Sequence, residues 1–202
     1  MWHWWAQALP KLEDVTVPRC FMPIENAGSI ELHCFSDACE TGYGAVCYFR
    51  IASGSSWCCQ FVTGKSRVAP LKALRIPRLE LCAATLATKL AQLVSSQLRP
   101  DLERTFFWTD STSDLQYIAN SSRRFRVFVA NCVSVIHENS DVSQWCYIDT
   151  KNNPADIVSR ELLWIIAQRL NFGFKVQRFY KGAKPTGRQG LLFCCHCQSV
   201  IL

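Results

Sequence analysis

Four acidic residues stand where the sequence predicts that a strand ends or a helix begins: Asp37, Glu80, Asp110 and Asp156. Carboxylates gathered at one edge of a sheet repel each other in a partly dry site, and divalent cations remove that repulsion. Ligand sets made only of oxygen select Mg²⁺ or Mn²⁺ rather than zinc. Two such ions can activate a water and stabilise the leaving oxygen of a phosphodiester. The acids therefore indicate a two-metal hydrolase that needs no nucleophilic side chain.

The stretch 32–47, LHCFSDACETGYGAVC, must position the first acid. Its alternating pattern predicts a strand over 32–37 with Asp37 at the end, and further strands over 43–51 and 56–63. Short connections containing Gly and Ser predict an antiparallel meander. An aspartate before a glycine-containing turn is usually only a hairpin cap, so Asp37 indicates a metal site only together with the other acids.

A long helix predicted over 78–98 carries the second acid. Leucines and alanines repeat there at near-helical spacing after Pro77, and Arg99-Pro100 ends the pattern. Glu80 falls in the predicted first turn, where its alternative role is a favourable interaction with the helix dipole. The preceding run 64–77 contains four basic residues and no acid, which predicts a basic loop.

The last two acids follow a predicted crossover. We expect a strand over 104–110, helices over 114–119 and 125–137, a strand over 144–148 and a final helix over 155–160. If the strand over 104–110 pairs in parallel with that over 32–37, Asp37 and Asp110 end at the same edge. The prediction is an α/β fold whose five-stranded mixed sheet has three antiparallel strands, then two parallel ones, flanked by helices.

Composition is that of one ordinary domain with flanking segments. The chain has 202 residues, 49% of them hydrophobic, and no run of 18 apolar residues, so we expect no membrane span. The N-terminus lacks a signal-peptide pattern, so the twelve cysteines are expected to be reduced in an intracellular protein. Residues 1–159 carry 15 basic and 15 acidic residues, and the remainder carries 7 and 1. Nucleic-acid affinity in the body must therefore come from local patches.

Four segments, in order, resemble the ribonuclease H-like domain of BEL/Pao-type retrotransposon polyproteins. They are SDACETGYGAV (36–46), KSRVAPLKALRIPRLELCAA (65–84), FWTDST (107–112) and NPADIVSR (153–160). The resemblance implies a ribonuclease H-like fold and a metal-dependent endonuclease that hydrolyses the RNA strand of RNA–DNA hybrids. It also implies that the four acids are catalytic and hold two Mg²⁺ or Mn²⁺ ions. The order Asp, Glu, Asp, Asp argues against a related integrase, in which the Glu comes last.

The same resemblance defines the expected domains and partners. Residues 1–29 would be a Trp-rich remnant of a reverse-transcriptase region, 30–160 the ribonuclease H-like domain, and 161–202 a poorly ordered basic tail. Cys194, Cys195, His196 and Cys197 in that tail are too close together for a self-contained zinc site. Expected partners are an RNA–DNA hybrid and the reverse-transcriptase and integrase regions of the same polyprotein, in the cytoplasm or in virus-like particles.

Residues near the acids are candidates for contact with the nucleic acid: Lys65, Arg67, Lys72, Arg75, Arg78, Thr112 and Asn120. The basic residues would contact phosphates, and the last two would contact the backbone or 2′-hydroxyl groups. The alternatives are a solvated loop for the basic residues, and capping and turn roles for Thr112 and Asn120. For the whole chain, the alternative is a catalytically inactive remnant that serves only as a nucleic-acid-binding or interaction segment.

Overall fold

The computed structural model describes residues 28–53, 56–72, 74–120 and 124–160. Five strands form one sheet in the order β3-β2-β1-β4-β5. They are β1 (Ile30–Ala38), β2 (Gly42–Ser53), β3 (Ser56–Val68), β4 (Leu102–Thr109) and β5 (Trp145–Tyr147). β1, β2 and β3 are antiparallel neighbours, whereas β4 pairs in parallel with β1 and β5 in parallel with β4. The predicted five-stranded mixed sheet is confirmed. The predicted segments 1–29 and 161–202 lie outside the described residues, apart from residues 28 and 29.

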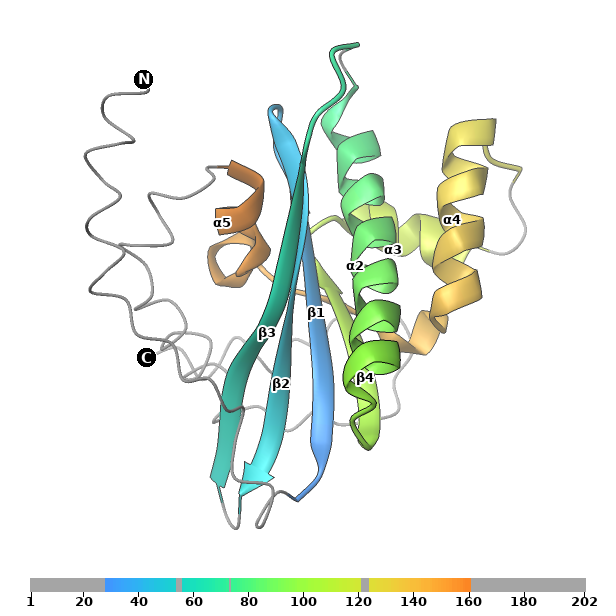
Figure 1. Ribbon diagram of the computed structural model, residues 1–202. Helices are drawn as coiled ribbons and strands as arrows, with labels where there is room; N and C mark the ends of the chain where they lie inside the picture. The colour runs from blue at the N-terminus through green and yellow to red at the C-terminus, as the bar shows by residue number, and fades with distance from the viewer. Residues whose placement is uncertain (1–27, 54–55, 73, 121–123, 161–202) are drawn as a thin grey trace, which may run out of the picture.

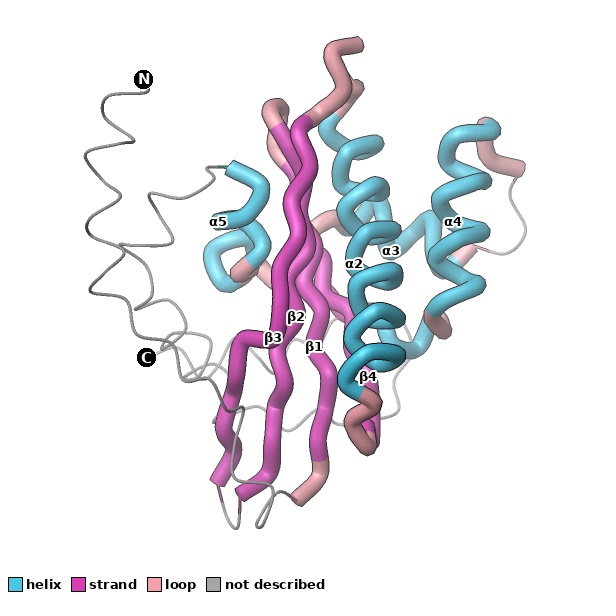
Figure 2. Tube along the Cα trace, viewed as in Figure 1, coloured by secondary structure: helices cyan, strands magenta, loops and turns pink. Residues whose placement is uncertain are grey.

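Helices cover both faces of the sheet (Figure 1). α2 (Ile76–Leu98), α3 (Thr112–Ala119) and α4 (Val127–Asn139) lie on one side, and α5 (Ala155–Arg160) lies on the other. Figure 2 shows the strands as a single layer, seen edge-on, between these two sets of helices. None of the described helices combines the length and the apolar character needed to cross a membrane.

Successive side chains of β1 point to opposite faces of the sheet, and they belong to two separate core clusters. Leu32 and Cys34 belong to a large cluster with Leu81 of α2. Phe35 belongs to a smaller cluster with Trp108 on the opposite side of the sheet. Both faces of the sheet are therefore apolar, as expected for a sheet with parallel strands that is covered on both sides.

The end of β3 differs from the prediction. This strand continues to Val68, so Lys65 and Arg67 lie on a strand, opposite Ala45 and Tyr43 of β2, and not in a loop. The local polarity of 64–68 predicted a loop, but main-chain pairing with β2 extends the strand through it. Charged side chains are common on edge strands, and β3 is the edge of this sheet.

The start of α2 also differs from the prediction. The helix begins at Ile76, two residues early, and includes Pro77 in its first turn. Proline is tolerated there because the first N–H groups of a helix have no intrahelical acceptor. Glu80 consequently lies beyond the first turn, which argues against the helix dipole as the reason for its position. The other element boundaries differ from the predicted ones by at most two residues.

Candidate metal centre

Parallel pairing of β1 with β4 brings the first and third acids to one edge of the sheet. Ser36 lies opposite Thr109, so Asp37 and Asp110 are the next residues on neighbouring strands. This edge is at the top of the sheet in Figure 1, where α2 begins. The predicted parallel register is therefore present, and it places two of the acids side by side.

Helix α5 is tied to the same edge by one hydrogen bond from a side chain of its own and one from the residue pair just before it. Nδ2 of Asn153 donates to the carbonyl oxygen of Ser36 at 2.9 Å, across 117 positions of sequence. The hydroxyl of Ser159 donates to Oδ2 of Asp37, across 122 positions. Asp156 lies in the first turn of α5 and is thereby brought to the end of β1.

Gly44 of β2 makes room for α5. A Cβ atom at this position would lie 2.6 Å from Cγ1 of Val158, well inside van der Waals contact. The thiol of Cys39 adds a further tie, since it donates to the carbonyl oxygen of Ser159 at 2.8 Å. This glycine lies inside the strand predicted over 43–51, and the structure shows that it also permits the close packing of a helix on that strand.

The environment of Asp37 shows that three acids lie close together. This side chain is 6% exposed. Burial raises its pKa to about 7, with a hydrogen bond from Ser159 acting in the opposite direction and the charges of Asp110 and Asp156 adding to the rise. Such an effect requires carboxylates near one another. β1, β4 and α5 therefore contribute to one acidic cluster.

Glu80 joins this cluster from α2. Burial raises the pKa of Glu80, a hydrogen bond with the Ser111 hydroxyl opposes the rise, and the charge of Asp110 adds to it. Asp110 is therefore a shared neighbour of Glu80 on one side and of Asp37 on the other. Its Oδ1 atom is buried and has no hydrogen-bond partner among the described residues. The four predicted acids therefore form a series of neighbours in which Asp156 adjoins Asp37, Asp37 adjoins Asp110, and Asp110 adjoins Glu80.

A fifth acid, Asp114, lies beside them and was missed in the sequence. It is in the first turn of α3 and is completely buried. Burial, followed by the charges of Glu80 and Asp110, raises its pKa to about 8. A hydrogen bond with the Ser111 side chain opposes this rise, and both carboxylate oxygens of Asp114 are buried. The available signal was an acid one helical turn after Asp110, which resembles an ordinary helix-dipole partner.

The salt bridges found among the described residues lie away from Asp37 and Asp110. Both of the salt bridges found within them involve Glu31, which is at the other end of β1. In the same residues, no three His, Cys, Asp or Glu side chains are already arranged to hold a metal ion. The carboxylate oxygens would nevertheless suit Mg²⁺ or Mn²⁺, and Oδ1 of Asp110 is a buried acceptor that a cation would satisfy.

Four of the basic candidates lie on the surface between β3 and α2. Lys65 and Arg67 are exposed on β3. Their partners across the strand pair, Ala45 and Tyr43, belong to the core on the α2 side, so these two basic residues share that face. Lys72 and Arg75 are exposed in the connection to α2, and Arg75 is the N-cap residue of that helix.

The other three candidates lie on helices or at their ends. The guanidinium of Arg78 is 5.2 Å from the ring centroid of Phe128 on α4. Thr112 is the exposed first residue of α3, but the N-cap is Ser111, whose Oγ accepts the N–H of Asp114 at 3.2 Å. Asn120 is the C-cap of the same helix, in line with the turn role considered for it. The capping role considered for Thr112 therefore falls to its neighbour.

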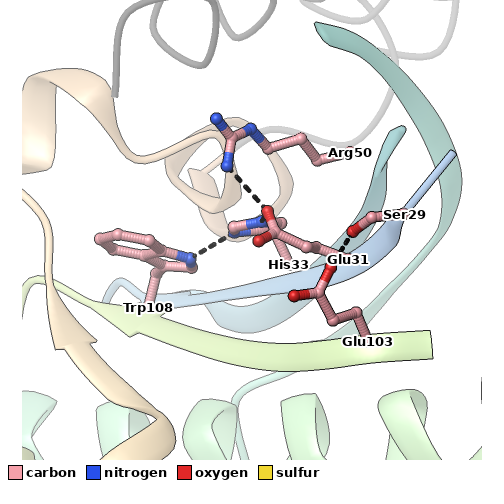
Figure 3. Close-up of polar contacts among 6 residues, drawn as sticks. All are labelled: Ser29, Glu31, His33, Arg50, Glu103 and Trp108. Atoms are coloured by element: carbon pink, nitrogen blue, oxygen red, sulfur yellow. Dashed lines mark hydrogen bonds and ion pairs between the residues drawn. The ribbon is translucent and has the colours of Figure 1, made fainter. Parts of the chain in front are cut away.

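A second buried polar group lies farther along β1, and Figure 3 shows its contacts. Nη1 of Arg50 donates to Oε2 of Glu31 at 2.8 Å, and Nε1 of Trp108 donates to Nδ1 of His33 at 3.1 Å. Because Nδ1 accepts a hydrogen bond, neutral His33 carries its proton on Nε2, which is 3.3 Å from the same Glu31 oxygen. Each ionisable group in this network therefore faces a partner.

The pKa values of Glu31 and His33 reflect both their burial and the charged or hydrogen-bonding partners that they face. Burial alone would raise the pKa of Glu31, but hydrogen bonds and charge from His33 and Arg50 hold it below its ordinary value. Burial lowers the pKa of His33, and the interaction with Glu31 only partly opposes this effect. We therefore interpret the network as structural, in contrast to the acids at the other end of the strand.

Comparison with known proteins adds three observations. Residues 1–111 match the family model described as the Pao retrotransposon-like RNaseH-like domain. None of the curated proteins matches the chain. The matched segment contains Asp37, Glu80 and Asp110, and it leaves Asp114 and Asp156 outside.

The third observation concerns solved structures. The N-terminal RNase H domain of Rv2228c from Mycobacterium tuberculosis, fused to maltose-binding protein, has a TM-score of 0.47 and 9% identity, covering 71% of this chain and 98% of that one. RNase H1 from Halobacterium salinarum NRC-1 has a TM-score of 0.40 and 10% identity, with coverages of 63% and 91%. LC11-RNase H1 in complex with an RNA/DNA hybrid has a TM-score of 0.39 and 12% identity, with the same coverages.

Proposed function

The chain belongs to the family of Pao retrotransposon-like RNaseH-like domains, and from that premise we propose that it is a metal-dependent endonuclease that hydrolyses the RNA strand of RNA–DNA hybrids. One observation supports the proposal: the parallel register places Asp37 and Asp110 side by side at one sheet edge, and the charge of Asp110 acts on both Asp37 and Glu80. Both salt bridges among the described residues involve Glu31, so neither of them lies beside Asp110.

The four acids Asp37, Glu80, Asp110 and Asp156 would hold two Mg²⁺ or Mn²⁺ ions. When bound, the ions would neutralise the carboxylates and supply Lewis-acid activation of a water at a phosphodiester. Oxygen ligands of this kind suit both metals.

The protein contributes the orientation of the carboxylates. The Ser159 hydroxyl holds Oδ2 of Asp37, which leaves the other oxygen of that carboxylate for a cation. The hydrogen bond between Ser111 and Glu80 fixes the acid of α2 relative to the start of α3. These two serines come from opposite sides of the sheet, so each half of the site has its own positioning residue.

Exposed basic residues would hold the substrate beside the acids. Lys65, Arg67, Lys72 and Arg75 lie on the surface that leads into α2, and we expect them to contact phosphates of the hybrid. Phosphate contacts position a duplex without reading its sequence, as a nuclease acting on any hybrid requires. Thr112 and Asn120, at the two ends of α3, are the candidates for contact with 2′-hydroxyl groups. The reverse-transcriptase region of the same polyprotein would supply the hybrid.

The experiment compares the purified 202-residue chain with its Asp110→Asn variant on a labelled RNA–DNA hybrid, with Mg²⁺ or with Mn²⁺. We expect cleavage of the RNA strand only, and a loss of about 1,000-fold in the variant, or ~4 kcal/mol of barrier. Asp101→Asn, at an exposed acid away from the cluster, is the matched control and should cleave normally.

Two results would overturn the nuclease proposal. One is the absence of cleavage with either metal, and the other is cleavage that survives Asp110→Asn. The chain would then be the inactive remnant considered above. Its binding to the uncleaved hybrid, measured over a range of salt concentrations, would show whether it retains a nucleic-acid-binding role.

A further inference from the structure

Exposed apolar side chains lie between β3 and α2, and the proposed site gives them no role. Leu71 is fully exposed, at 108% of its reference surface, Val68 is 77% exposed, and Ile76 is also exposed. Among the described residues eight large hydrophobic side chains are exposed, and these three fall within nine positions of the sequence. A single exposed apolar residue is ordinary, whereas a group of them on one segment indicates a contact surface.

Strand register places this apolar segment beside the acids. Asp37 lies opposite Gly44 of β2, and Gly44 lies opposite Ser66 of β3. Val68 is therefore two strands away from Asp37, about 10 Å across the sheet, and two residues further along. Figure 1 shows the connection that follows β3 projecting beyond the top of the sheet, which is the edge that carries the acids.

Both ends of this connection are fixed to the body of the protein. The N–H of Ala69 donates to the carbonyl oxygen of Thr41 at 2.9 Å, in the turn between β1 and β2. At the other end Arg75 is the N-cap of α2, and its carbonyl oxygen accepts the N–H of Arg78 at 2.9 Å. The exposed side chains between these ends are therefore presented from a segment anchored at the acidic edge.

The charged residues near these apolar side chains in sequence are all basic. Residues 41–79 contain no Asp or Glu. Lys72 and Arg75 are exposed on the connection, and Lys65 and Arg67 are exposed on β3. Cations together with projecting apolar side chains suit a nucleic acid, which offers phosphates to the former and sugars and base edges to the latter. Interfaces between proteins are in contrast depleted of lysine, which favours nucleic acid as the partner.

We propose that Leu71 and Val68 contact the minor groove of the RNA–DNA hybrid and hold the duplex beside the acids. Such a hybrid has A-form geometry, whose major groove is too deep and narrow for side chains and whose minor groove is wide and shallow. Apolar side chains of minor-groove-binding proteins insert between base steps. Lys72, next to Leu71, binds a phosphate at the rim of the same groove. The inference rests on the proposed function, because it takes the hybrid as the ligand.

The test measures the affinity of the full chain for a fluorescently labelled RNA–DNA hybrid by anisotropy, with Mg²⁺ present. Every chain carries Asp110→Asn, so that the hybrid stays intact. Adding Leu71→Ser should weaken binding about tenfold, which corresponds to ~1.4 kcal/mol. Leu98→Ser is the matched control, because Leu98 is half-exposed at the last residue of α2, about 33 Å along the helix from its start, and should bind as the parent does.

Salt dependence separates a groove contact from a phosphate contact. Between about 50 and 200 mM salt, Leu71→Ser should weaken binding by the same factor throughout, because a leucine displaces no counterions. Lys72→Gln should instead reduce the slope of log affinity against log salt concentration by about 1. A reduced slope in Leu71→Ser would show that the substitution disturbs phosphate contacts, and the proposed groove contact would be wrong.

Val68→Thr provides a second variant that keeps a β-branched side chain on the strand. It should weaken binding about threefold, since a hydroxyl replaces one methyl group at the contact. Both variants should unfold at the temperature of the parent, because their side chains are exposed. If Leu71→Ser unfolds at a lower temperature, Val68→Thr decides. Unchanged affinity for the hybrid in both variants overturns the proposal and assigns the apolar side chains to a protein partner.

Failure of this inference is distinguishable from failure of the proposed function, because one is measured by binding and the other by cleavage. If the wild type cleaves nothing but Leu71→Ser lowers the affinity for the hybrid, the inference stands without the nuclease. If the wild type cleaves the hybrid and Leu71→Ser binds it normally, the nuclease stands and the inference fails. A wild-type chain that neither binds nor cleaves the hybrid overturns both.

Discussion

Strand β1 carries a buried acid near each end, and the fold surrounds the two acids in opposite ways. Glu31 faces Arg50 and His33, and its pKa is held below the ordinary value. Asp37, six residues further along the same face of the strand, faces Asp110 and Asp156, and its pKa is raised to about 7. The two acids have nearly the same exposure, 5% and 6%, so burial alone does not explain the difference.

The difference lies in the source of positive charge. At the Glu31 end the fold supplies its own cation, and the network in Figure 3 needs nothing from outside the protein. At the Asp37 end the fold supplies further carboxylates. Strongly perturbed acids clustered in this way are typical of functional sites, where a ligand completes the arrangement. We infer that the network at the Glu31 end of β1 stabilises the fold. The carboxylates at the Asp37 end destabilise the fold when no ligand is bound, and their role is to bind one.

The largest expected effect comes from removing the internal cation. Arg50→Met leaves Glu31 buried without its ion pair and removes the stacking of Arg50 on Trp57, whose ring centroid is 3.9 Å from the guanidinium carbon. We expect the free energy of unfolding to fall by about 3–5 kcal/mol in urea titrations followed by circular dichroism. Arg104→Met, at an exposed position on β4, should change it by less than about 0.5 kcal/mol. Equal losses of unfolding free energy in Arg50→Met and Arg104→Met would contradict the proposed difference between the two ends of β1.

A second prediction concerns pH in the absence of metal. Folded Asp37 and Asp114 keep their protons up to about pH 7 and pH 8, whereas unfolded aspartates lose theirs near pH 4. Their stabilising contribution is therefore complete below about pH 4 and is lost as the pH rises through 7 to 8. We expect the free energy of unfolding to fall by about 2 kcal/mol between pH 6.5 and pH 8, measured by urea titration in EDTA.

At the Glu31 end of β1, the change of unfolding free energy with pH should have the opposite sign. Because the pKa of His33 is lowered in the folded state, its contribution is lost as the pH falls below about 6.5. Above that pH His33 no longer contributes, but Cys132 does, because a hydrogen bond with Cys82 lowers its pKa to about 7 and makes stability rise with pH. The double variant Asp37→Asn, Asp114→Asn should therefore lose the fall in stability between pH 6.5 and pH 8 that the wild type shows. A wild-type stability that rises with pH over this range would contradict the prediction.

The smallest effect is expected within the network of Figure 3. Trp108→Phe removes the N–H that donates to Nδ1 of His33, and should cost about 1 kcal/mol of unfolding free energy. Without this donor, Nδ1 can accept a proton, so the pKa of His33 should rise in an NMR titration. Trp145→Phe is the matched control, because its indole donates to Ser140 and not to His33. An unchanged His33 titration in Trp108→Phe would show that the indole does not determine the tautomer.

The sheet order and the convergence of four acids could be predicted because their signals are local. Alternation along 32–37 and 104–110 identified two strands, and the long helix between them required a parallel crossover. Once that pairing was assumed, Asp37 and Asp110 had to meet at one edge. The structure confirms this pairing through the register of Ser36 with Thr109.

The features that were missed depend on contacts between distant segments. Lys65 and Arg67 have a loop-like local sequence, and only pairing with β2 makes them part of a strand. The bond between Trp108 and His33 spans 75 positions, and no local pattern indicates it. Asp114 looks like a first-turn acid on an amphipathic helix, and its burial follows from how α3 packs beside α2. Composition and periodicity do not contain this information.

The two hydrogen bonds that hold α5 against β1 have a consequence for protein synthesis. A nascent chain that has been synthesised as far as Asp110 contains β1 to β4 and three of the four expected acids. It still lacks Asp156 and Ser159, the serine that orients Asp37. Under the proposed function, the site is therefore incomplete until translation has passed Ser159 and this short helix has left the ribosome. A product terminated before Asn153 would contain all five strands but would lack Asp156 and Ser159, so under the proposed function it would not cleave the hybrid.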